Sequence, residues 1–139
     1  MSTNRATTEK VIELVSAFAW DELAAHIHED IVMEAPYQAF HTGPMKRGKA
    51  VFMAGMEFVP NVFSRFELTI QKIYDCPDQG SVVFEMTSDG TFAADPDRSY
   101  ANRYLMVFGF RDGQIVLWRE IFNPAIMNDK MGFMLTAAG

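Results

Sequence analysis

The chain has little of what marks secreted, membrane or nucleic-acid-binding proteins. It contains a single cysteine, Cys76, so no disulfide can form within the chain. No apolar run approaches the roughly 18 residues of a membrane-spanning helix. Basic residues are also few: 12 Lys and Arg stand against 18 Asp and Glu, for a net charge of −6. Because proteins that bind nucleic-acid phosphates concentrate Lys and Arg, we expect neither a nucleic-acid nor a membrane partner, and a cytoplasmic location.

The groups that hold metals and cofactors are scarce as well. The three histidines, His26, His28 and His41, and the one cysteine show no ligand spacing, and no glycine-rich phosphate loop is present. We therefore expect no metal and no cofactor. What remains is 139 residues, 49% hydrophobic and 22% charged, which predicts one globular domain over residues 1–139. The 10 methionines and 12 phenylalanines suit either an ordinary core or an irregular apolar cavity.

The hydrophobic pattern changes along the chain from a helical period to a strand period. Helices are predicted over residues 3–20, 21–27 and 50–63, the last broken near Pro60. A strand over 30–37 and a loop precede the third helix. Four β-rich segments follow, at 64–76, 80–93, 99–111 and 114–123, and read as an antiparallel meander. A short helix or irregular tail closes the chain.

This order predicts an α+β fold. Helices that come first and a sheet that comes afterwards pack in two layers, with the helices on one face of the sheet. We expect a cone-shaped, curved antiparallel sheet wrapped around the N-terminal helices. A strongly bent sheet covered in this way encloses a pocket.

The last predicted strand contains the segment "LWREIFNP", which sets a carboxylate among aromatic residues. Successive side chains of a strand point to opposite faces, so Trp118, Glu120 and Phe122 share one face and Arg119 lies on the other. A carboxyl group desolvated among aromatic rings has its charged form disfavoured, which raises its pKa toward the range of a general acid or base. If this face points inward, Glu120 is the candidate catalytic residue.

The turn "FRDGQ" decides which residues of the preceding strand lie beside Glu120. A type I turn with a bulge at Gly113 would leave Arg103 on the outer face with Arg119, whereas a two-residue turn would bring Arg103 inside. The spacing of the aromatic residues in the segment 100–110 favours the first alternative. It pairs Tyr104 with Glu120, Met106 with Trp118 and Asn102 with Phe122.

Several short motifs, in this order, resemble one family. From "RGKA" at 47–50 to "REIFNP" at 119–124, through Glu85, "YANRY" and "DGQI", the chain is similar to the phenazine-biosynthesis A/B proteins. The element order resembles the SnoaL-like branch of the nuclear transport factor 2-like superfamily, to which ketosteroid isomerase and limonene epoxide hydrolase also belong. The resemblance implies an α+β cone with an apolar pocket, and this fold hosts unrelated chemistries.

The resemblance to ketosteroid isomerase does not extend to its catalytic residues. It rests on "IELV" at 12–15 and "EAP" at 34–36. The position of its general base is taken by Ala35 and that of its catalytic tyrosine by Val11. Without a general base and a hydrogen-bond donor for the oxyanion, enolisation loses the two main contributions to its rate. Classical steroid isomerisation is therefore not expected.

The other two relatives each share one group with this chain. The late-strand acid of limonene epoxide hydrolase matches Glu120, but its water-positioning residues match Met33 and Ala35. Its Arg–Asp pair falls near Met86 and Ser88, and Asp89 could replace the acid of that pair only through a bulge. The phenazine A/B pattern keeps its acid at Glu120, whereas its helix histidine falls at Gly55.

The candidate site and its alternatives follow from these comparisons. Glu120 is the predicted acid or base, with substrate contacts predicted for Asn102, Tyr104, Trp118, Phe122, Tyr37 and His41; the last lies in a loop that resembles a pocket mouth. The first hypothesis is a cofactor-independent lyase, isomerase or cyclase, ketosteroid isomerase-like or polyketide cyclase-like, acting on a small apolar or aromatic molecule. The second is a binding protein for such a molecule, without turnover. The third is an assembly module with a vestigial pocket.

A homodimer is also predicted from the outer face of the sheet. The residues expected to form an apolar patch there, beside Arg103 and Arg119, are Leu105, Val107, Leu117 and Ile121.

Overall fold

The computed structural model describes residues 3–37, 44–127 and 129–130. Its elements, in chain order, are α1 (Thr3–Ser16), α2 (Trp20–Ala24), β1 (Ile27–Glu34), β2 (Pro44–Arg47), α3 (Lys49–Val62), β3 (Phe63–Cys76), the 3-10 turn η1 (Pro77–Gln79), β4 (Ser81–Phe92), β5 (Ser99–Arg111) and β6 (Gln114–Phe122). Residues 124–127 are helical as well. None of the helices in these ranges is long and apolar enough to cross a membrane. One domain over residues 1–139 stays a prediction.

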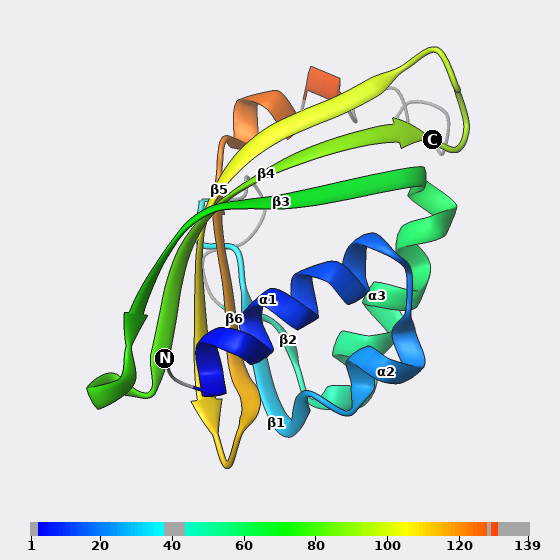
Figure 1. The fold of residues 1–139 in the computed structure, drawn as a ribbon. Helices are drawn as coiled ribbons and strands as arrows, with labels where there is room; N and C mark the ends of the chain where they lie inside the picture. Colours follow the sequence, from blue (N-terminus) through cyan, green and yellow to red (C-terminus); the bar gives the residue numbers. More distant parts are fainter. Residues whose placement is uncertain (1–2, 38–43, 128, 131–139) are drawn as a thin grey trace.

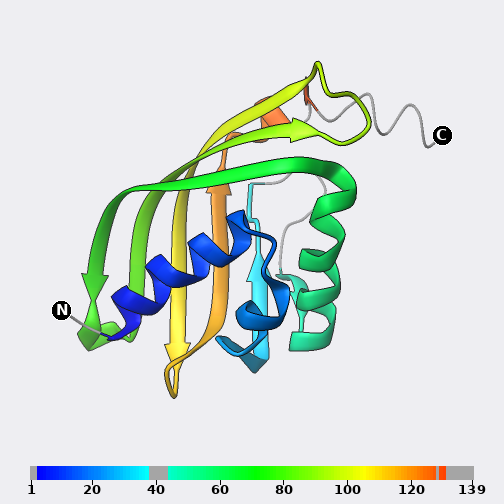
Figure 2. The ribbon, with the colours of Figure 1, turned by 45° about the vertical axis from the view of Figure 1, so that its right-hand side comes forward.

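The strands form one strongly curved sheet. Its order is β2-β1-β6-β5-β4-β3, and all neighbours are antiparallel except β1 and β6 (Figure 1). Strands β3 to β6 are the predicted meander, and β1 joins its far edge. The three helices lie within the concave side of the sheet (Figure 2). The predicted α+β fold, a curved sheet wrapped around N-terminal helices, is confirmed.

The core lies between these helices and the inner face of the sheet. The side chains that α1 and α3 bury there repeat at helical spacing; they include Val11, Leu14, Val15, Phe52 and Met56. The centre of this core is Trp118 on β6, which is 2% exposed. Its ring centroid lies 4.5 Å from that of Phe108 on β5 and 5.1 Å from that of Phe52 on α3. Burying an apolar side chain of this kind contributes roughly 1.5–3 kcal/mol.

Several predicted boundaries are wrong. The second helix is Trp20–Ala24 and not 21–27, and the strand predicted over 30–37 is Ile27–Glu34. The first helix ends at Ser16, because Phe18 adopts a positive φ of 56°. Pro60 does not break α3, which continues to Val62; a proline this close to the C-terminal end interrupts only the last turn. β2 was expected to be loop, since a strand of four residues at the edge of a sheet carries too little alternation to be recognised.

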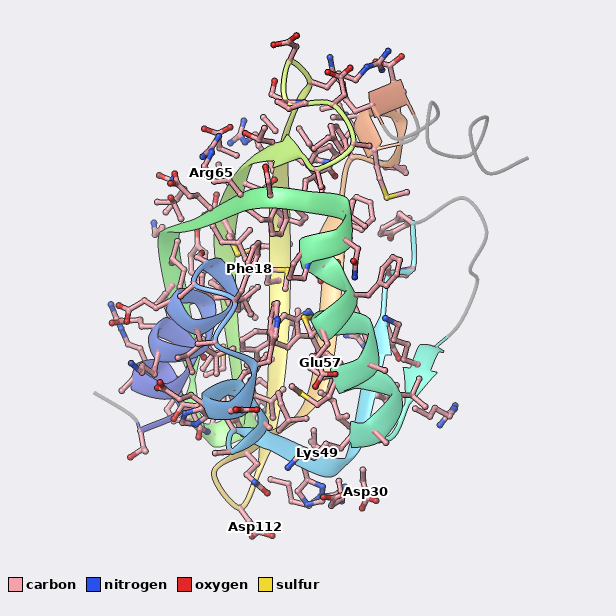
Figure 3. The ribbon with its side chains drawn as sticks, turned by 90° about the vertical axis from the view of Figure 1, so that its right-hand side faces the viewer. Phe18, Asp30, Lys49, Glu57, Arg65 and Asp112 are labelled. Atoms are coloured by element: carbon pink, nitrogen blue, oxygen red, sulfur yellow. The ribbon has the colours of Figure 1, made fainter. Side chains whose placement is uncertain are left out.

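The predicted β5–β6 turn and register are also wrong, although the predicted faces are right. Asp112 and Gly113 form a two-residue turn with φ of 53° and 77°, the geometry of a type I′ hairpin (Figure 3). Arg111 pairs with Gln114 across it. A bulge at Val116 then adds one residue to β6, because Gly109 faces Leu117 while Phe110 faces Ile115. The observed pairs are Tyr104 with Phe122, Met106 with Glu120 and Phe108 with Trp118.

This register differs from the predicted one by two residues, and a shift of two keeps every side chain on its face. The two-residue turn alone would have turned Arg103 inward. The extra residue of the bulge reverses this, so Arg103 returns to the outer face. Arg103 is therefore exposed. Arg119 lies on the outer face as well, where its Nε donates a hydrogen bond to Glu34 Oε2 at 2.7 Å.

The turn predicts the effect of one substitution. Gly113→Ala should lower the free energy of unfolding by about 1 kcal/mol, because a residue with a Cβ is disfavoured at positive φ. A Cβ at Gly113 would meet no atom within 4 Å, so the cost comes from the backbone alone. Urea denaturation measures it. Asp112→Asn is the matched control and should be neutral, since Asn tolerates the left-handed conformation as Asp does. Equal stability of both variants with the unmodified protein would contradict this turn geometry.

Candidate functional site

A cavity of about 210 Å³ lies between α1, α3 and the inner face of the sheet. Its lining residues are Val15, Met33, Lys46, Gly55, Met56, Val59, Phe63, Phe66, Leu68, Met86, Tyr104, Trp118 and Glu120. All except Lys46, Tyr104 and Glu120 are apolar. Glu57 lies on the opposite, exposed side of α3 (Figure 3). The predicted apolar pocket is therefore present, with three polar groups on its wall.

Glu120 is the acidic group of this cavity. It stands two residues from Trp118 on the same face of β6, and Trp118 Nε1 donates a hydrogen bond to Glu120 Oε1 at 2.9 Å. Burial raises the pKa of the Glu120 carboxyl above the ordinary value of a glutamate. The Trp118 hydrogen bond and the positive charge of Lys46 lower this pKa in part. The surface that Glu120 keeps is on the cavity wall, so it can exchange a proton with a molecule bound there.

A chain of hydrogen bonds runs from the cavity wall into the sheet. Tyr104 Oη and Ser88 Oγ are 3.0 Å apart, and Ser88 Oγ accepts a hydrogen bond from the Asn102 N–H at 3.2 Å. Asn102 Nδ2 donates to Tyr100 Oη at 2.8 Å and to the Asn123 carbonyl at 3.1 Å. Burial raises the pKa of both Tyr104 and Tyr100, so both phenols stay protonated. Tyr104 therefore presents a neutral hydroxyl beside the cavity.

The structure brings three of the predicted site residues together. Glu120, Trp118 and Tyr104 line the cavity. Asn102 is buried, but its amide group is already bonded within the protein: Nδ2 to the two groups above and Oδ1 to the backbone N–H of Arg103 at 2.8 Å. A substrate contact by Asn102 stays a prediction that the cavity lining does not support.

The other predicted contacts lie away from the lining. Phe122 packs on Tyr104, with 5.8 Å between ring centroids, at the edge of the site. Tyr37 is 64% exposed. His41 lies outside the described residues. Contacts from these three residues to a ligand stay predictions.

Lys46 is the lining residue that the sequence did not indicate. It lies on β2, which was predicted to be loop, and a single basic residue in a loop carries no signal of burial. Its amine occupies space beside α3: a Cβ added at Gly55 would collide with Lys46 Nζ and approach Lys46 Cε to 3.0 Å. A side chain at this position would force the flexible end of Lys46 to move.

Apart from Glu120, the catalytic groups expected from ketosteroid isomerase and limonene epoxide hydrolase are absent from the described residues. Val11 and Ala35 are buried apolar side chains, so neither supplies a base or a hydroxyl. Asp89 lies on the exposed side of β4, where its Oδ1 accepts a hydrogen bond from Arg65 Nη2 at 3.1 Å. No bulge interrupts the β4–β5 pairing that could turn it inward. Across the described ranges, no three His, Cys, Asp or Glu side chains are arranged to hold a metal ion.

The curved sheet and the covered cavity define the fold class, which is that of nuclear transport factor 2-like structures. The fold is similar to a structure of a nuclear transport factor 2-like protein from Burkholderia pseudomallei, with a TM-score of 0.78, 20% identity, and coverage of 94% of this chain and 98% of that one. Within this class the chain belongs to the SnoaL-like family, because a model of the SnoaL-like domain matches residues 8–118. The resemblance inferred from the sequence is thereby confirmed.

Individual relatives share about a quarter of their residues with the chain. An uncharacterised Bacillus subtilis protein, YesE, is 27% identical over 114 residues, covering 82% of this chain and 75% of that protein. An uncharacterised PhzA/B-like protein from Pseudomonas aeruginosa is 26% identical over 129 residues, covering 93% and 88%. An LEH-like epoxide hydrolase from M. tuberculosis shares the fold, with a TM-score of 0.74, 20% identity and coverage of 98% and 94%.

The raised pKa predicts a pH-dependent effect on stability. A carboxyl whose folded-state pKa is raised binds its proton more tightly in the native than in the unfolded protein. The cost of ionising it is therefore absent at low pH and grows as pH rises above the unfolded value near ~4.3. Glu120→Gln cannot ionise and keeps an acceptor for the Trp118 N–H. It should raise the melting temperature more at pH 8 than at pH 4.

The matched control is Glu57→Gln on the exposed side of α3, which should change the melting temperature by a similar, small amount at both pH values. Equal shifts for Glu120→Gln at pH 4 and pH 8 would show that Glu120 does not carry this cost.

Proposed function

We propose that this protein is a cofactor-independent enzyme of the lyase, isomerase or cyclase type, in which Glu120 is the general acid or base. The observation that carries the proposal is the Glu120 carboxyl on the wall of an otherwise apolar cavity. Desolvation there raises its pKa toward the working pH, where proton transfer to and from a substrate is most effective.

The hydrogen bond from Trp118 orients the acid for this role. It holds Oε1, whereas Oε2 has no hydrogen-bond partner among the described residues and is not buried away from the cavity. A rigid, fully buried indole restricts the carboxyl to one orientation, which is a requirement for efficient proton transfer. Oε2 is therefore the atom proposed to exchange the proton with the substrate.

The cavity supports a small substrate with an apolar body. Its volume of about 210 Å³ lies below the roughly 300–1,000 Å³ of sites for drug-sized ligands. The methionine and phenylalanine side chains on its wall match an apolar or aromatic molecule of about one ring. The Tyr104 hydroxyl is the second polar group that could orient a carbonyl or hydroxyl of this molecule.

The relatives support small-molecule chemistry of this kind. One is described as PhzA/B-like and another as an LEH-like epoxide hydrolase. Epoxide hydrolysis is not favoured here, because the resemblance to limonene epoxide hydrolase puts Met33 and Ala35 at its water-positioning residues. Steroid isomerisation is not favoured either, for lack of a base at Ala35.

The alternative is a binding protein for the same class of ligand. It is favoured by Gly55, which stands where the phenazine A/B pattern has its histidine, so one of two expected catalytic groups is missing. In that case Glu120 would only form a hydrogen bond with the ligand. Native mass spectrometry of the purified protein, which detects a retained small molecule, supplies candidate ligands for both functions.

Turnover separates the two functions. With a panel of small ketones, aromatic acids and any retained ligand in D₂O, we expect protein-dependent proton exchange or conversion, followed by NMR. Glu120→Gln should reduce the rate by about 10²–10⁴-fold, the usual contribution of a general acid or base, and retain ligand binding. Glu57→Gln should be fully active. If Glu120→Gln converts a compound as fast as the unmodified protein, the catalytic role of Glu120 is wrong. If the unmodified protein converts none of the compounds, the binding function is preferred.

We also propose a homodimer through the outer face of the sheet. Leu105 is 41% exposed there, and Val107, Leu117 and Ile121 are half-buried beside it. Residues that face each other across β5 and β6 place these side chains next to one another, since Leu105 pairs with Ile121 and Gly109 with Leu117. Such an apolar area on an open sheet is an interaction surface in many proteins.

Light scattering tests the dimer. The unmodified protein should have the mass of two chains at micromolar concentration. Leu105→Lys should give the mass of one chain, because the substitution places a charge in the patch. Lys10→Glu on the exposed side of α1, away from the outer face of the sheet, is the charge-changing control and should stay dimeric. A monomeric unmodified protein would overturn the assembly.

A further inference from the structure

We propose that Lys46 is the anion-binding residue of the cavity, so that the molecule bound there is a small apolar carboxylate. The inference rests on the proposed function in that it names the substrate class of the same site. Its claim about binding can be tested without turnover.

The strand pairing places Lys46 inside. Lys46 lies opposite Met33 on β1, and Met33 lies opposite Trp118 on β6. Residues opposite one another on neighbouring strands share a face of the sheet, so the three side chains form a row across β2, β1 and β6. Met33 and Trp118 are both buried on the inner face, whereas Arg47, the next residue of β2, is exposed. Lys46 therefore projects from the edge of the sheet into the cavity.

Gly55 provides the space for the amine. It lies in the middle of α3 without a positive φ, so the backbone does not require a glycine there. In a helix interior glycine is less favourable than alanine. The structural consequence of the glycine is the absence of a Cβ at the place that Lys46 Nζ occupies. The helix face and the lysine thus fit together at this one point.

The charges in the cavity leave the ammonium without a close partner. In the part of the chain that the structure describes, Lys46 forms no hydrogen bond or ion pair, although its charge acts on Glu120. A cation in an apolar environment is costly unless an anion compensates it. Glu120 is the one acidic residue among the lining residues, and its burial disfavours the negative charge. A carboxylate of the bound molecule is the group that fits beside Lys46.

In this arrangement Lys46 and Glu120 have separate roles. Lys46 would bind the carboxylate and fix the orientation of the ligand. The apolar body would lie among the methionine and phenylalanine side chains of the wall. Glu120 would then face a carbon or oxygen atom of that body, where it can donate or accept a proton. A neutral molecule of the same shape would lose the contact with Lys46.

Binding of benzoate and of its neutral analogue benzamide tests the inference by titration calorimetry at constant ionic strength. The unmodified protein should bind benzoate at least tenfold more tightly than benzamide. Lys46→Met should lose this preference and bind benzamide as before, which also shows that the cavity is intact. Lys49→Met, a lysine beside Glu29 on the protein surface, should keep the preference. No preference for benzoate in the unmodified protein, or an undiminished one in Lys46→Met, overturns the proposal.

The binding assay also separates this inference from the proposed function. Glu120→Gln should keep the preference for benzoate, since the acid is not the anion-binding group. A protein that binds benzoate through Lys46 but shows no turnover with any compound retains the inference and refutes the enzyme. A protein that turns over neutral substrates and has no preference for benzoate retains the enzyme and refutes the inference.

Discussion

The burial of Trp118 is the interaction on which both the core and the site depend. Its indole joins β6 to β5 through Phe108 and to α3 through Phe52, and it is almost completely removed from solvent. A buried indole N–H needs an acceptor, and Glu120 Oε1 supplies it. The same packing that stabilises the fold therefore holds a carboxyl group in an apolar place and raises its pKa. The central core residue, Trp118, and the acid, Glu120, are therefore coupled through one hydrogen bond.

The chemistry of the cavity is determined by a few positions on a common scaffold. Val11 and Ala35, where a related isomerase has its catalytic groups, are apolar and contribute only to packing. The amine of Lys46 lies beside Gly55, where the resemblance to the phenazine A/B proteins implies a histidine. The cavity wall thus has a cation from β2 and an acid from β6. The family resemblance therefore identifies the fold and the place of the site, and the particular side chains limit the reaction.

The long elements could be predicted because their pattern repeats. Strands β3 to β6 each show many alternations, and α1 and α3 bury residues at regular helical spacing. β2 has four residues and one neighbour, so its pairing with β1 could not be recognised from its own composition. The β5–β6 register was missed for another reason. Asp112 and Gly113 are a usual pair for a type I′ turn, but the bulge at Val116, which compensates the turn, has no signature in the sequence.

The sequence by itself determined which face of β6 each residue occupies, because alternation is a property of the local backbone. Glu120 with Trp118 on one face and Arg119 on the other follow from it. Only the tertiary structure decided that Met106 lies opposite Glu120 and that Lys46 reaches the cavity. The pairing of Met106 with Glu120 depends on the number of residues in a turn and a bulge. The position of Lys46 depends on the pairing of β2 with β1 and on the space beside Gly55 in α3. Both are relations between separate segments, which no local pattern encodes.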